Sequence, residues 1–459
     1  MTPVDSRPKE SDRDADDDLR SEYERDADRL LYTSALRRLS GVTQVISPTD
    51  AYVHHDRLTH SLKVAQVSQA LAKSLGERVD VDVVHAAALA HDIGHPPFGH
   101  AAEDELMGIL DGRIDRFGAP ISAEKISAIL PDSFEGNAQS FRIVARTAAR
   151  KWEERDHGLN LRYRTLAAIL KYPWQRGQQP AEYSGLENRK WGAYHSESVE
   201  LKLALEIAAA TGVMGTHRSV EADIMDWADD VSYAVHDTED FFRAGLIPLD
   251  ALRTNDTLWD GFLTYASDSI RARRVQDWAF NKTIFDAVSV AVRDRLPRRP
   301  YLGDFESRED LHLFGSDSIR ALLRGIAINS NGDLEISIEQ RTRVELLKKL
   351  TRYFVIEQPD LYFSQKGQRA VVRELFWDLW DMAQASKLGR KSVPLPARFA
   401  DYCDLALRSS SVDGYDSSPQ RLARATVDFI CSLTDGQALN MRNQIRNGGQ
   451  PPNARVASI

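Results

Sequence analysis

Residues 89–100, LAHDIGHPPFGH, place three histidines and an aspartate in twelve positions, beside two glycines and two prolines. The 459-residue chain has twelve histidines, and seven of them fall between residues 54 and 100. Imidazole and carboxylate together suit a divalent transition metal, magnesium or manganese. An aspartate buried at the end of an apolar helix is costly unless it is paired or coordinates a cation. His91 and Asp92 are therefore candidate metal ligands.

A further ligand candidate, His60, begins the segment HSLKVAQVSQALAKSLG. Val64, Val67 and Leu71 follow it at helical spacing, so the pattern predicts a helix with His60 on its buried face. Gly76 is a good position for the end of this helix. The next segment, VDVVHAAALAHDIG, is apolar for two turns, which is typical of a helix enclosed by other helices.

The backbone after His91 and Asp92 is broken by Gly94 and by a pair of prolines at 96 and 97. We expect this turn to bring His95 and His100 into the same cavity as the metal ligands. HDIGH also imitates the HExxH helix of zinc proteases. That motif needs its second histidine inside a helix and a glutamate base, whereas here a glycine precedes the histidine and prolines follow it. The sequence therefore disfavours a protease.

The segment EADIMDWADDVSYAVHDTEDFF (221–242) predicts a helix that presents Asp229, Tyr233 and Asp237 on one face. Acids stacked on one face repel each other unless a cation or a hydroxylated ligand uses them. We therefore expect Asp229 to be a metal ligand and Asp237 to accept a hydrogen bond from substrate. The remaining acids are interpreted as solvated surface; they are Asp226, Asp230, Glu239 and Asp240.

Composition limits the class of protein. No run of 18 apolar residues is present, which excludes a membrane span. Two cysteines, Cys403 and Cys431, are too few for a disulfide framework or a cysteine-rich zinc site, and they fit a reducing cytoplasm. The net charge of −9 argues against a bulk electrostatic binder of nucleic acid. A polyanionic substrate would need a local cation.

Long segments with apolar residues at helical spacing predict an all-α fold. Residues 331–338 (NGDLEISI) are the best candidate for a strand or hairpin. Helices are also expected at 195–243, 339–358 and 366–385. We expect one large helical body with insertions. A disordered charged arm (1–24) precedes a catalytic core (25–245). A helical C-terminal part (246–442) packs on that core, and a disordered tail (443–459) follows.

Several motifs resemble the deoxynucleoside triphosphate triphosphohydrolases, the dGTPase-like branch of the HD-domain metal phosphohydrolases. They are RLTHS (57–61), HDIGHPPFGHAAE (91–103), FEGNAQSFRI (134–143), LKYPW (170–174) and ADDVSYAVHD (228–237). They run in the family's order over roughly residues 25–440. The His…His-Asp…Asp set is shared by all HD phosphohydrolases, whereas FEGNAQ together with HPPFGH is highly specific. Two positions depart from many relatives: Gly136, where they carry histidine, and Lys63, interpreted as a surface change.

The resemblance implies a fold, an HD-domain helical core with additional helices, and a set of site residues. A divalent metal would be held by His60, His91, Asp92 and Asp229. Substrate would be bound by Arg57 at the α-phosphate, by Gln44 and Asp237 at the 3′-hydroxyl, and by Tyr233 against C2′ of the sugar. The acid/base group would be His95, His100 and Glu103, with Glu135 near it.

The implied reaction is hydrolysis of a dNTP to deoxynucleoside and intact triphosphate. Attack at the α-phosphorus needs a polarised phosphoryl oxygen and a water of lowered pKa, which a metal supplies. A histidine suits protonation of the departing 5′-oxygen. Two alternatives stay open: an HD phosphohydrolase for another nucleotide or phosphoester, and a regulatory protein that responds to a nucleotide or to single-stranded DNA. We also expect a homo-oligomer without a membrane partner, and an allosteric nucleotide or single-stranded DNA remains open as a further partner.

Overall fold

The computed structural model describes residues 5–8, 19–44, 56–149, 156–181, 190–272, 279–389, 393–408 and 414–447. Within these ranges the chain forms eighteen α-helices and one antiparallel pair of short strands. These elements are α1 (Glu22–Leu31), α2 (Ser34–Arg38), α3 (Arg57–Leu75), α4 (Val81–Ala90), α5 (His100–Leu110), α6 (Gly136–Arg142), α7 (Tyr163–Ile169), α8 (Ser198–Ala210), α9 (Val220–Arg243), α10 (Leu249–Thr254), α11 (Asp256–Ala272), α12 (Lys282–Arg293), α13 (Phe305–Leu323), β1 (Ala327–Ile328), β2 (Leu334–Glu335), α14 (Ile338–Thr351), α15 (Pro359–Lys387), α16 (Ala397–Arg408), α17 (Ser418–Ile430) and α18 (Asp435–Asn447). The expected all-α fold and the hairpin near 331–338 are confirmed.

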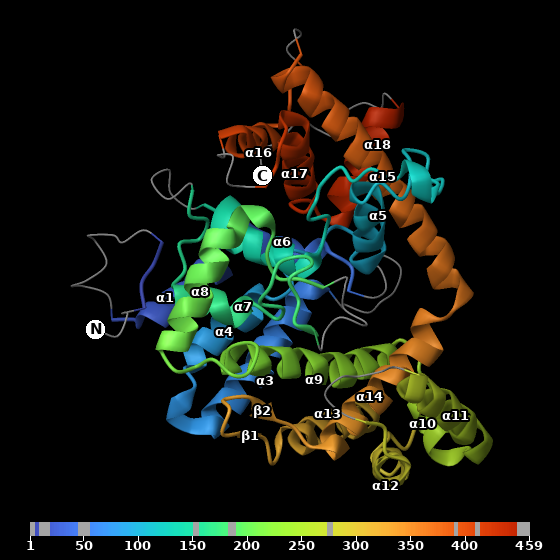
Figure 1. The fold of residues 1–459 in the computed structure, drawn as a ribbon. Helices are drawn as coiled ribbons and strands as arrows, with labels where there is room; N and C mark the ends of the chain where they lie inside the picture. The colour runs from blue at the N-terminus through green and yellow to red at the C-terminus, as the bar shows by residue number, and fades with distance from the viewer. Residues whose placement is uncertain are drawn as a thin grey trace.

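The centre of the molecule is α4, which packs against α1, α3, α7 and α9 (Figure 1). Every residue of α4 from Ala86 to Ala90 is fully buried, as its apolar sequence predicts. The Asp56 carboxylate caps α3 by accepting a hydrogen bond from Thr59 N at 2.7 Å. The same helix stops at Gly76, whose φ of +78° favours glycine. His60 therefore lies on the buried face of α3, as the spacing predicts.

The continuous helix expected over 195–243 is instead two helices, α8 and α9. Gly212, with a φ of +73°, follows the last turn of α8. The Ser219 side chain then caps α9 by accepting a hydrogen bond from Ala222 N at 3.2 Å. This break lets α8 pack on α7, while α9 runs on across α3 and carries the acidic face.

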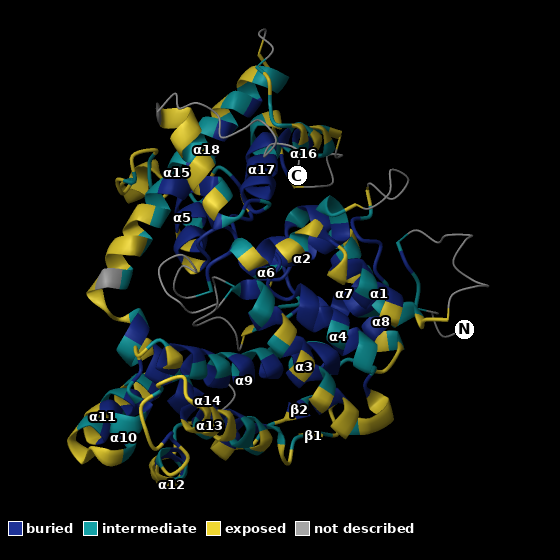
Figure 2. Ribbon diagram, turned by 180° about the vertical axis from the view of Figure 1, so that it is seen from behind, coloured by how far each residue is buried: buried dark blue, intermediate teal, exposed yellow. Residues whose placement is uncertain are grey.

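The buried apolar side chains form two main cores. The first holds α1, α3, α4 and α7–α9 together with α10–α14, and the second is built by α5 and α15–α18 (Figure 2). The long helix α15 runs along one side of the molecule between these two regions (Figure 1). The part expected to be a single C-terminal unit, 246–442, is thus shared between both cores.

The segment 91–99 joins the two cores. It leaves α4 with Ile93 in the first core and enters α5 with Phe98 in the second. Phe98 has a φ of +67° and Gly99 a φ of +57°. A positive φ at a bulky residue is strained, and such strain persists only where the surroundings fix it. The segment 91–99 is therefore held at the junction of the two cores.

The expected disordered arm and tail differ from the structure where their residues are described. Arg7 is buried, and its Nη1 donates to Asp26 Oδ1 at 2.6 Å, so an ion pair anchors part of the arm to α1. At the other end α18 continues to Asn447, because Arg446 pairs with Glu374 of α15 at 3.3 Å. No helix among the described residues is long and apolar enough to cross a membrane.

Candidate active site

Three of the four expected metal ligands form one cluster. His60 from α3 and His91 and Asp92 from the end of α4 each offer a ligand atom, and these atoms lie within 4.8 Å of one another. The fourth, Asp229, reaches them from α9. Its Oδ1 lies 3.0 Å from His60 Nε2 and 3.7 Å from His91 Nε2. Residues 169 positions apart in the chain therefore meet through the contact of α3 with α9.

The cluster fits a divalent ion. Ligand atoms bound at about 2.1 Å from an ion lie roughly 3 to 3.5 Å from each other, and His91 Nε2 is 3.5 Å from Asp92 Oδ1. His91 Nδ1 is held by the carbonyl of Ala88 at 2.7 Å. If Nδ1 carries the proton, Nε2 keeps its lone pair for a ligand. That nitrogen and His60 Nδ1 are buried, and neither has a hydrogen-bond partner within the described part of the chain.

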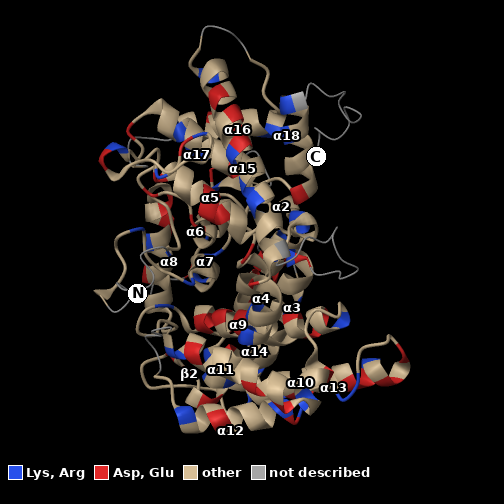
Figure 3. Cartoon of the chain, turned by 90° about the vertical axis from the view of Figure 1, so that its right-hand side faces the viewer, with Lys and Arg blue, Asp and Glu red and all other residues tan. Residues whose placement is uncertain are grey.

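Two cations border the cluster. Arg57 Nη1 donates to Asp92 Oδ2 at 2.6 Å, and Lys171 Nζ lies 3.4 Å from Asp229 Oδ2. Burial alone would raise the pKa of Asp92, but the histidines and Arg57 around it hold the value well below its usual range. Acidic and basic residues are interspersed over the ribbon in the view of Figure 3. Local cations such as these are what a polyanionic substrate would meet.

The expected acid/base group lies on the other side of Asp92. His95 Nδ1 is 3.2 Å from Asp92 Oδ1, and His95 Nε2 is 3.5 Å from Glu103 Oε1. Glu103 Oε2 in turn lies 2.7 Å from His100 Nδ1. Burial, reinforced by the Arg57 cation, lowers the pKa of His95 to about 4.

The two histidines lie side by side, with ring centroids 5.4 Å apart, but they differ in exposure to solvent. The side chain of His95 is 10% exposed and that of His100 is 73% exposed. Gly99 ends the turn, and His100 begins α5 at its solvent side while Glu103, one turn later, points inward. Glu103 therefore connects a buried imidazole to an exposed one.

Glu135 is engaged in helix capping. Its carboxylate accepts hydrogen bonds from the backbone N–H groups of Asn137 at 2.5 Å and Ala138 at 3.1 Å, at the start of α6. Its Oε1 also accepts a hydrogen bond from Lys190 Nζ at 2.9 Å. Gly136, the next residue, lies directly against Glu103, so the start of α6 forms one wall of the acid/base group.

The expected sugar-binding residues lie on α9 and next to Thr43. Tyr233 and Asp237 follow Asp229 along α9, and Asp237 is fully buried. Burial, together with the nearby carboxylates of Asp237 and Asp229, raises the pKa of the Tyr233 phenol. Gln44 lies beside Thr43, whose carbonyl receives Arg57 Nε at 3.0 Å. The buried Oε1 of Gln44 has no hydrogen-bond partner among the described residues.

Sequence reasoning missed the residues that hold these segments in place. Asp435 accepts hydrogen bonds from Thr43 N at 3.0 Å and from Phe98 N at 2.8 Å. It thus ties the backbone at Thr43 to the turn at Phe98. Lys171 lies in the LKYPW motif, which does not by itself indicate its partners, and Asp435 lies in none of the motifs given above.

The interpretation of four acids of α9 as solvated surface is wrong. Asp226 forms an ion pair with Lys171, and Asp230 forms one with Lys348. Asp240 is buried, and its Oδ2 lies 3.0 Å from Lys63 Nζ. Burial raises the pKa of Glu239 to about 7. The face of α9 opposite Asp229 is covered by α13 and α14, which the helical periodicity of α9 cannot indicate. Lys63, expected to be a surface change, is half-buried and pairs with Asp240 of α9.

Comparison with known proteins agrees with this geometry. The HD domain family model matches residues 57–234, which include all four metal-ligand candidates. The chain is 32% identical over 452 residues to a deoxyguanosinetriphosphate triphosphohydrolase-like protein of Streptomyces coelicolor, covering 93% of each chain. A protein of the same name from Corynebacterium efficiens is 38% identical over 380 residues, 78% of this chain and 80% of the relative. One from Corynebacterium diphtheriae is 30% identical over 448 residues, which cover 93% of this chain and 92% of the relative.

Proposed function

Because the chain belongs to the family of deoxyguanosinetriphosphate triphosphohydrolase-like proteins and carries an HD domain, we propose that it hydrolyses deoxynucleoside triphosphates such as dGTP. The products would be the deoxynucleoside and inorganic triphosphate, formed by attack of water at the α-phosphorus. The observation that carries this proposal is the environment of Asp92. One of its carboxylate oxygens faces the guanidinium of Arg57, and the other faces the imidazole of His95.

A divalent metal would be held by His60, His91, Asp92 and Asp229. When bound, it supplies Lewis-acid polarisation of a phosphoryl oxygen and lowers the pKa of water. The donor set of two imidazoles and two carboxylates suits zinc, manganese, iron or magnesium more than a soft thiolate-seeking ion.

Arg57 would bind the α-phosphate. Its Nη1 and Nε are used by Asp92 and Thr43, whereas its buried Nη2 has no hydrogen-bond partner in the described ranges. This leaves one N–H edge of a fixed guanidinium for a phosphate oxygen. A side chain at Gly99 could not be accommodated, because its Cβ would lie 2.8 Å from that nitrogen.

The sugar would be held between α9 and Gln44. Gln44 and Asp237 would bond the 3′-hydroxyl: Gln44 follows Thr43, whose carbonyl accepts a hydrogen bond from Arg57, and Asp237 is a buried acid of α9. The ring of Tyr233, one turn from each of Asp229 and Asp237, would pack against C2′ and exclude a ribose hydroxyl.

His95 would move the proton to the 5′-oxygen of the leaving deoxynucleoside. Its Nε2 faces Glu103, which in turn contacts the exposed imidazole of His100. This series of contacts offers a route for a proton between solvent and the buried histidine. Glu135 would act indirectly, by fixing the start of α6 against Glu103.

The proposal is tested by incubating the purified protein with each dNTP and with manganese or magnesium. Release of inorganic triphosphate and deoxynucleoside in equal amounts would support it. Release of pyrophosphate or orthophosphate would instead indicate an HD phosphohydrolase of another type. Nucleotide binding without turnover under any metal would indicate the regulatory protein.

The protein is further proposed to be a cytoplasmic homo-oligomer. Cys403 and Cys431 are both buried free thiols, which is compatible with a reducing compartment. Light scattering of the purified protein measures the oligomeric state directly.

A further inference from the structure

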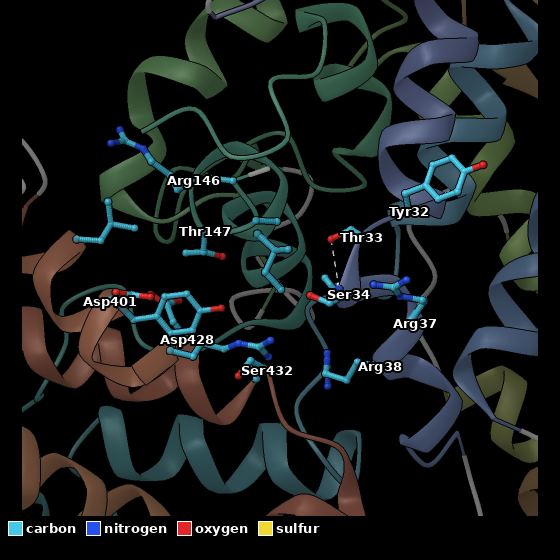
Figure 4. A pocket seen from close by; sticks show the side chains of 18 of the residues that line it. Tyr32, Thr33, Ser34, Arg37, Arg38, Arg146, Thr147, Asp401, Asp428 and Ser432 are labelled. Atoms are coloured by element: carbon cyan, nitrogen blue, oxygen red, sulfur yellow. Dashed lines mark hydrogen bonds between the residues drawn. The ribbon is translucent and has the colours of Figure 1, made fainter. Parts of the chain in front are cut away.

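The turn that joins α17 to α18 packs against the segment 38–43. Leu433 O accepts a hydrogen bond from Arg38 Nη1 at 3.0 Å. Thr434 fits against Gly41, where a Cβ would lie 2.9 Å from the threonine side chain. Arg38 and this turn also border the cavity drawn in Figure 4. Consecutive residues of the turn therefore contact successive positions of the segment.

Asp435 comes next in the chain, and its two carboxylate oxygens serve two different segments. Oδ2 accepts hydrogen bonds from the N–H of Thr43 at 3.0 Å and from the hydroxyl of the same residue. Oδ1 accepts one from Phe98 N at 2.8 Å. Asp435 is 7% exposed, and burial raises the pKa of its carboxyl. An amide in its place has only one acceptor oxygen and could hold only one of the two segments.

Both of these segments contact Arg57. Thr43 O accepts a hydrogen bond from Arg57 Nε at 3.0 Å. Gly99, which follows Phe98, lies against the other edge of the guanidinium: a Cβ built on it would be 2.8 Å from Arg57 Nη2 and 3.2 Å from Thr43 O. Because Asp435 holds the backbone at Thr43 and at Phe98, it fixes the surroundings of the guanidinium on two edges.

The backbone that Asp435 holds also carries Gln44. Gln44 directly follows Thr43, and its buried Oε1 has no hydrogen-bond partner among the described residues. A buried acceptor of this kind needs a donor, and a sugar hydroxyl is one. Since Asp435 bonds both the N–H and the hydroxyl of Thr43, the place of the neighbouring Gln44 side chain depends on Asp435.

We propose that Asp435 is a positioning residue that aligns Arg57 with Gln44 and thereby sets the preference for a nucleotide with a 3′-hydroxyl. The inference rests on the proposed function, in which Arg57 binds the α-phosphate and Gln44 the 3′-hydroxyl. These two groups stand at a limited separation on one deoxynucleotide, so both are bound together only when the two side chains keep a matching separation. Asp435 acts through Arg57 and Gln44, without a contact of its own to the substrate.

The variant Asp435→Asn tests this role, because it keeps the size of the side chain and removes one acceptor oxygen. The measured quantity is the ratio of kcat/KM for dGTP over 2′,3′-dideoxy-GTP, which lacks the 3′-hydroxyl. The wild type should prefer dGTP, and Asp435→Asn should lower the ratio about tenfold or more, because Gln44 no longer meets the hydroxyl. An equal loss of activity on both nucleotides, with the ratio kept, would overturn the proposal, since a general loss of stability has that effect.

Asp333→Asn is the matched control. Asp333 likewise accepts hydrogen bonds from the N–H and the hydroxyl of a threonine, Thr216, each at 2.6 Å, but it joins the β1–β2 hairpin to the turn between α8 and α9. Its variant should keep the ratio. Gln44→Ala should lose the preference by itself, and adding Asp435→Asn should lower the ratio no further, because the two residues act as one unit. A further, additive loss would overturn the proposed route through Gln44.

Hydrogen exchange tests the same contacts without turnover, in chelator and without nucleotide. In Asp435→Asn the amide of Thr43 or that of Phe98 should exchange at least about tenfold faster, and in Asp333→Asn neither should change. Unchanged exchange at both amides of Asp435→Asn overturns the proposal while leaving the proposed function intact. A wild type that hydrolyses no dNTP contradicts the proposed function, and the role of Asp435 toward substrate falls with it. An active wild type without preference for the 3′-hydroxyl overturns the role of Gln44 and this proposal, but not the hydrolysis.

Discussion

The carboxylate of Glu103 occupies the space that a side chain at Gly136 would need. A Cβ built on Gly136 would lie 2.2 Å from Glu103 Oε1 and 3.7 Å from His95 Cε1. The lack of a side chain at Gly136 therefore lets Glu103 lie beside His95.

Gly136→Ala is therefore expected to displace Glu103 and to lower kcat about 10- to 100-fold, because small misplacements of reacting groups are costly. Metal content should not change. The matched control is Gly261→Ala on the exposed side of α11, where a Cβ meets nothing within 4 Å. Wild-type turnover in Gly136→Ala would show that the position of Glu103 does not matter.

The metal cluster is tested by removing a ligand from the end of α4. His91→Ala should lose at least about 10- to 100-fold in metal affinity while the helical circular-dichroism spectrum is kept. His85→Ala, on the same helix but outside the cluster, is the control. Elemental analysis after dialysis decides: a full complement of metal in His91→Ala removes His91 from the ligand set.

The sequence indicated which residues form this candidate cluster because its members are set by local patterns. Helical spacing places His60 on a buried face, and the apolar run before His91 and Asp92 requires a charged group to be compensated. The same periodicity selected Asp229 from the acids of α9. These inferences need only the knowledge that three helices pack together.

The parts that failed depend on contacts between distant segments. Asp435 fixes Phe98 from 337 residues away, and Arg38 holds the carbonyl of His95 from 57 residues away. Glu239 was expected in solvent because α13, which covers it, lies far along the chain. The glycines and prolines of 94–99 predict a turn, but they do not determine which side chains near it face inward. The exposure of His100 could therefore not be predicted.

Glu239 gives the protein a pH-dependent stability. Its folded pKa of about 7 exceeds the ordinary value of 4.5, because burial disfavours its charged form. The folded state thus binds the proton more tightly, and this contribution to stability is lost as pH rises from about 4.5 to 7.

The variant Glu239→Gln, which is neutral at every pH, should therefore gain free energy of unfolding over the wild type across that interval, by at most about 3 kcal/mol. Urea unfolding at pH 5 and pH 8 measures the difference. Glu309→Gln, an exposed acid of the covering helix α13, should show none. A pH-independent difference for Glu239→Gln would mean that its carboxyl is solvated.

Tyr233 is expected to set the preference for deoxyribose. Tyr233→Ala should reduce the ratio of kcat/KM for dGTP over GTP by roughly 10- to 200-fold, since a steric wall under C2′ is worth about 1–3 kcal/mol. Tyr233→Phe keeps the ring and should keep the ratio. If the wild type already hydrolyses GTP and dGTP equally well, the proposed sugar pocket is wrong.

His95 is the residue on which the proposed proton transfer depends. It contacts both Asp92 and Glu103, yet the four-residue metal set is complete without it. His95→Ala should keep the metal and bind dNTP nearly normally, but lose about 10²- to 10⁴-fold in kcat, the usual range for a positioned acid or base. His100→Ala should lose less, because its exposed imidazole acts through Glu103. The measurement is kcat together with metal content and nucleotide affinity for each variant. A His95→Ala enzyme within a few-fold of the wild type would assign this histidine to support of Asp92 and leave the leaving group to be protonated from solvent.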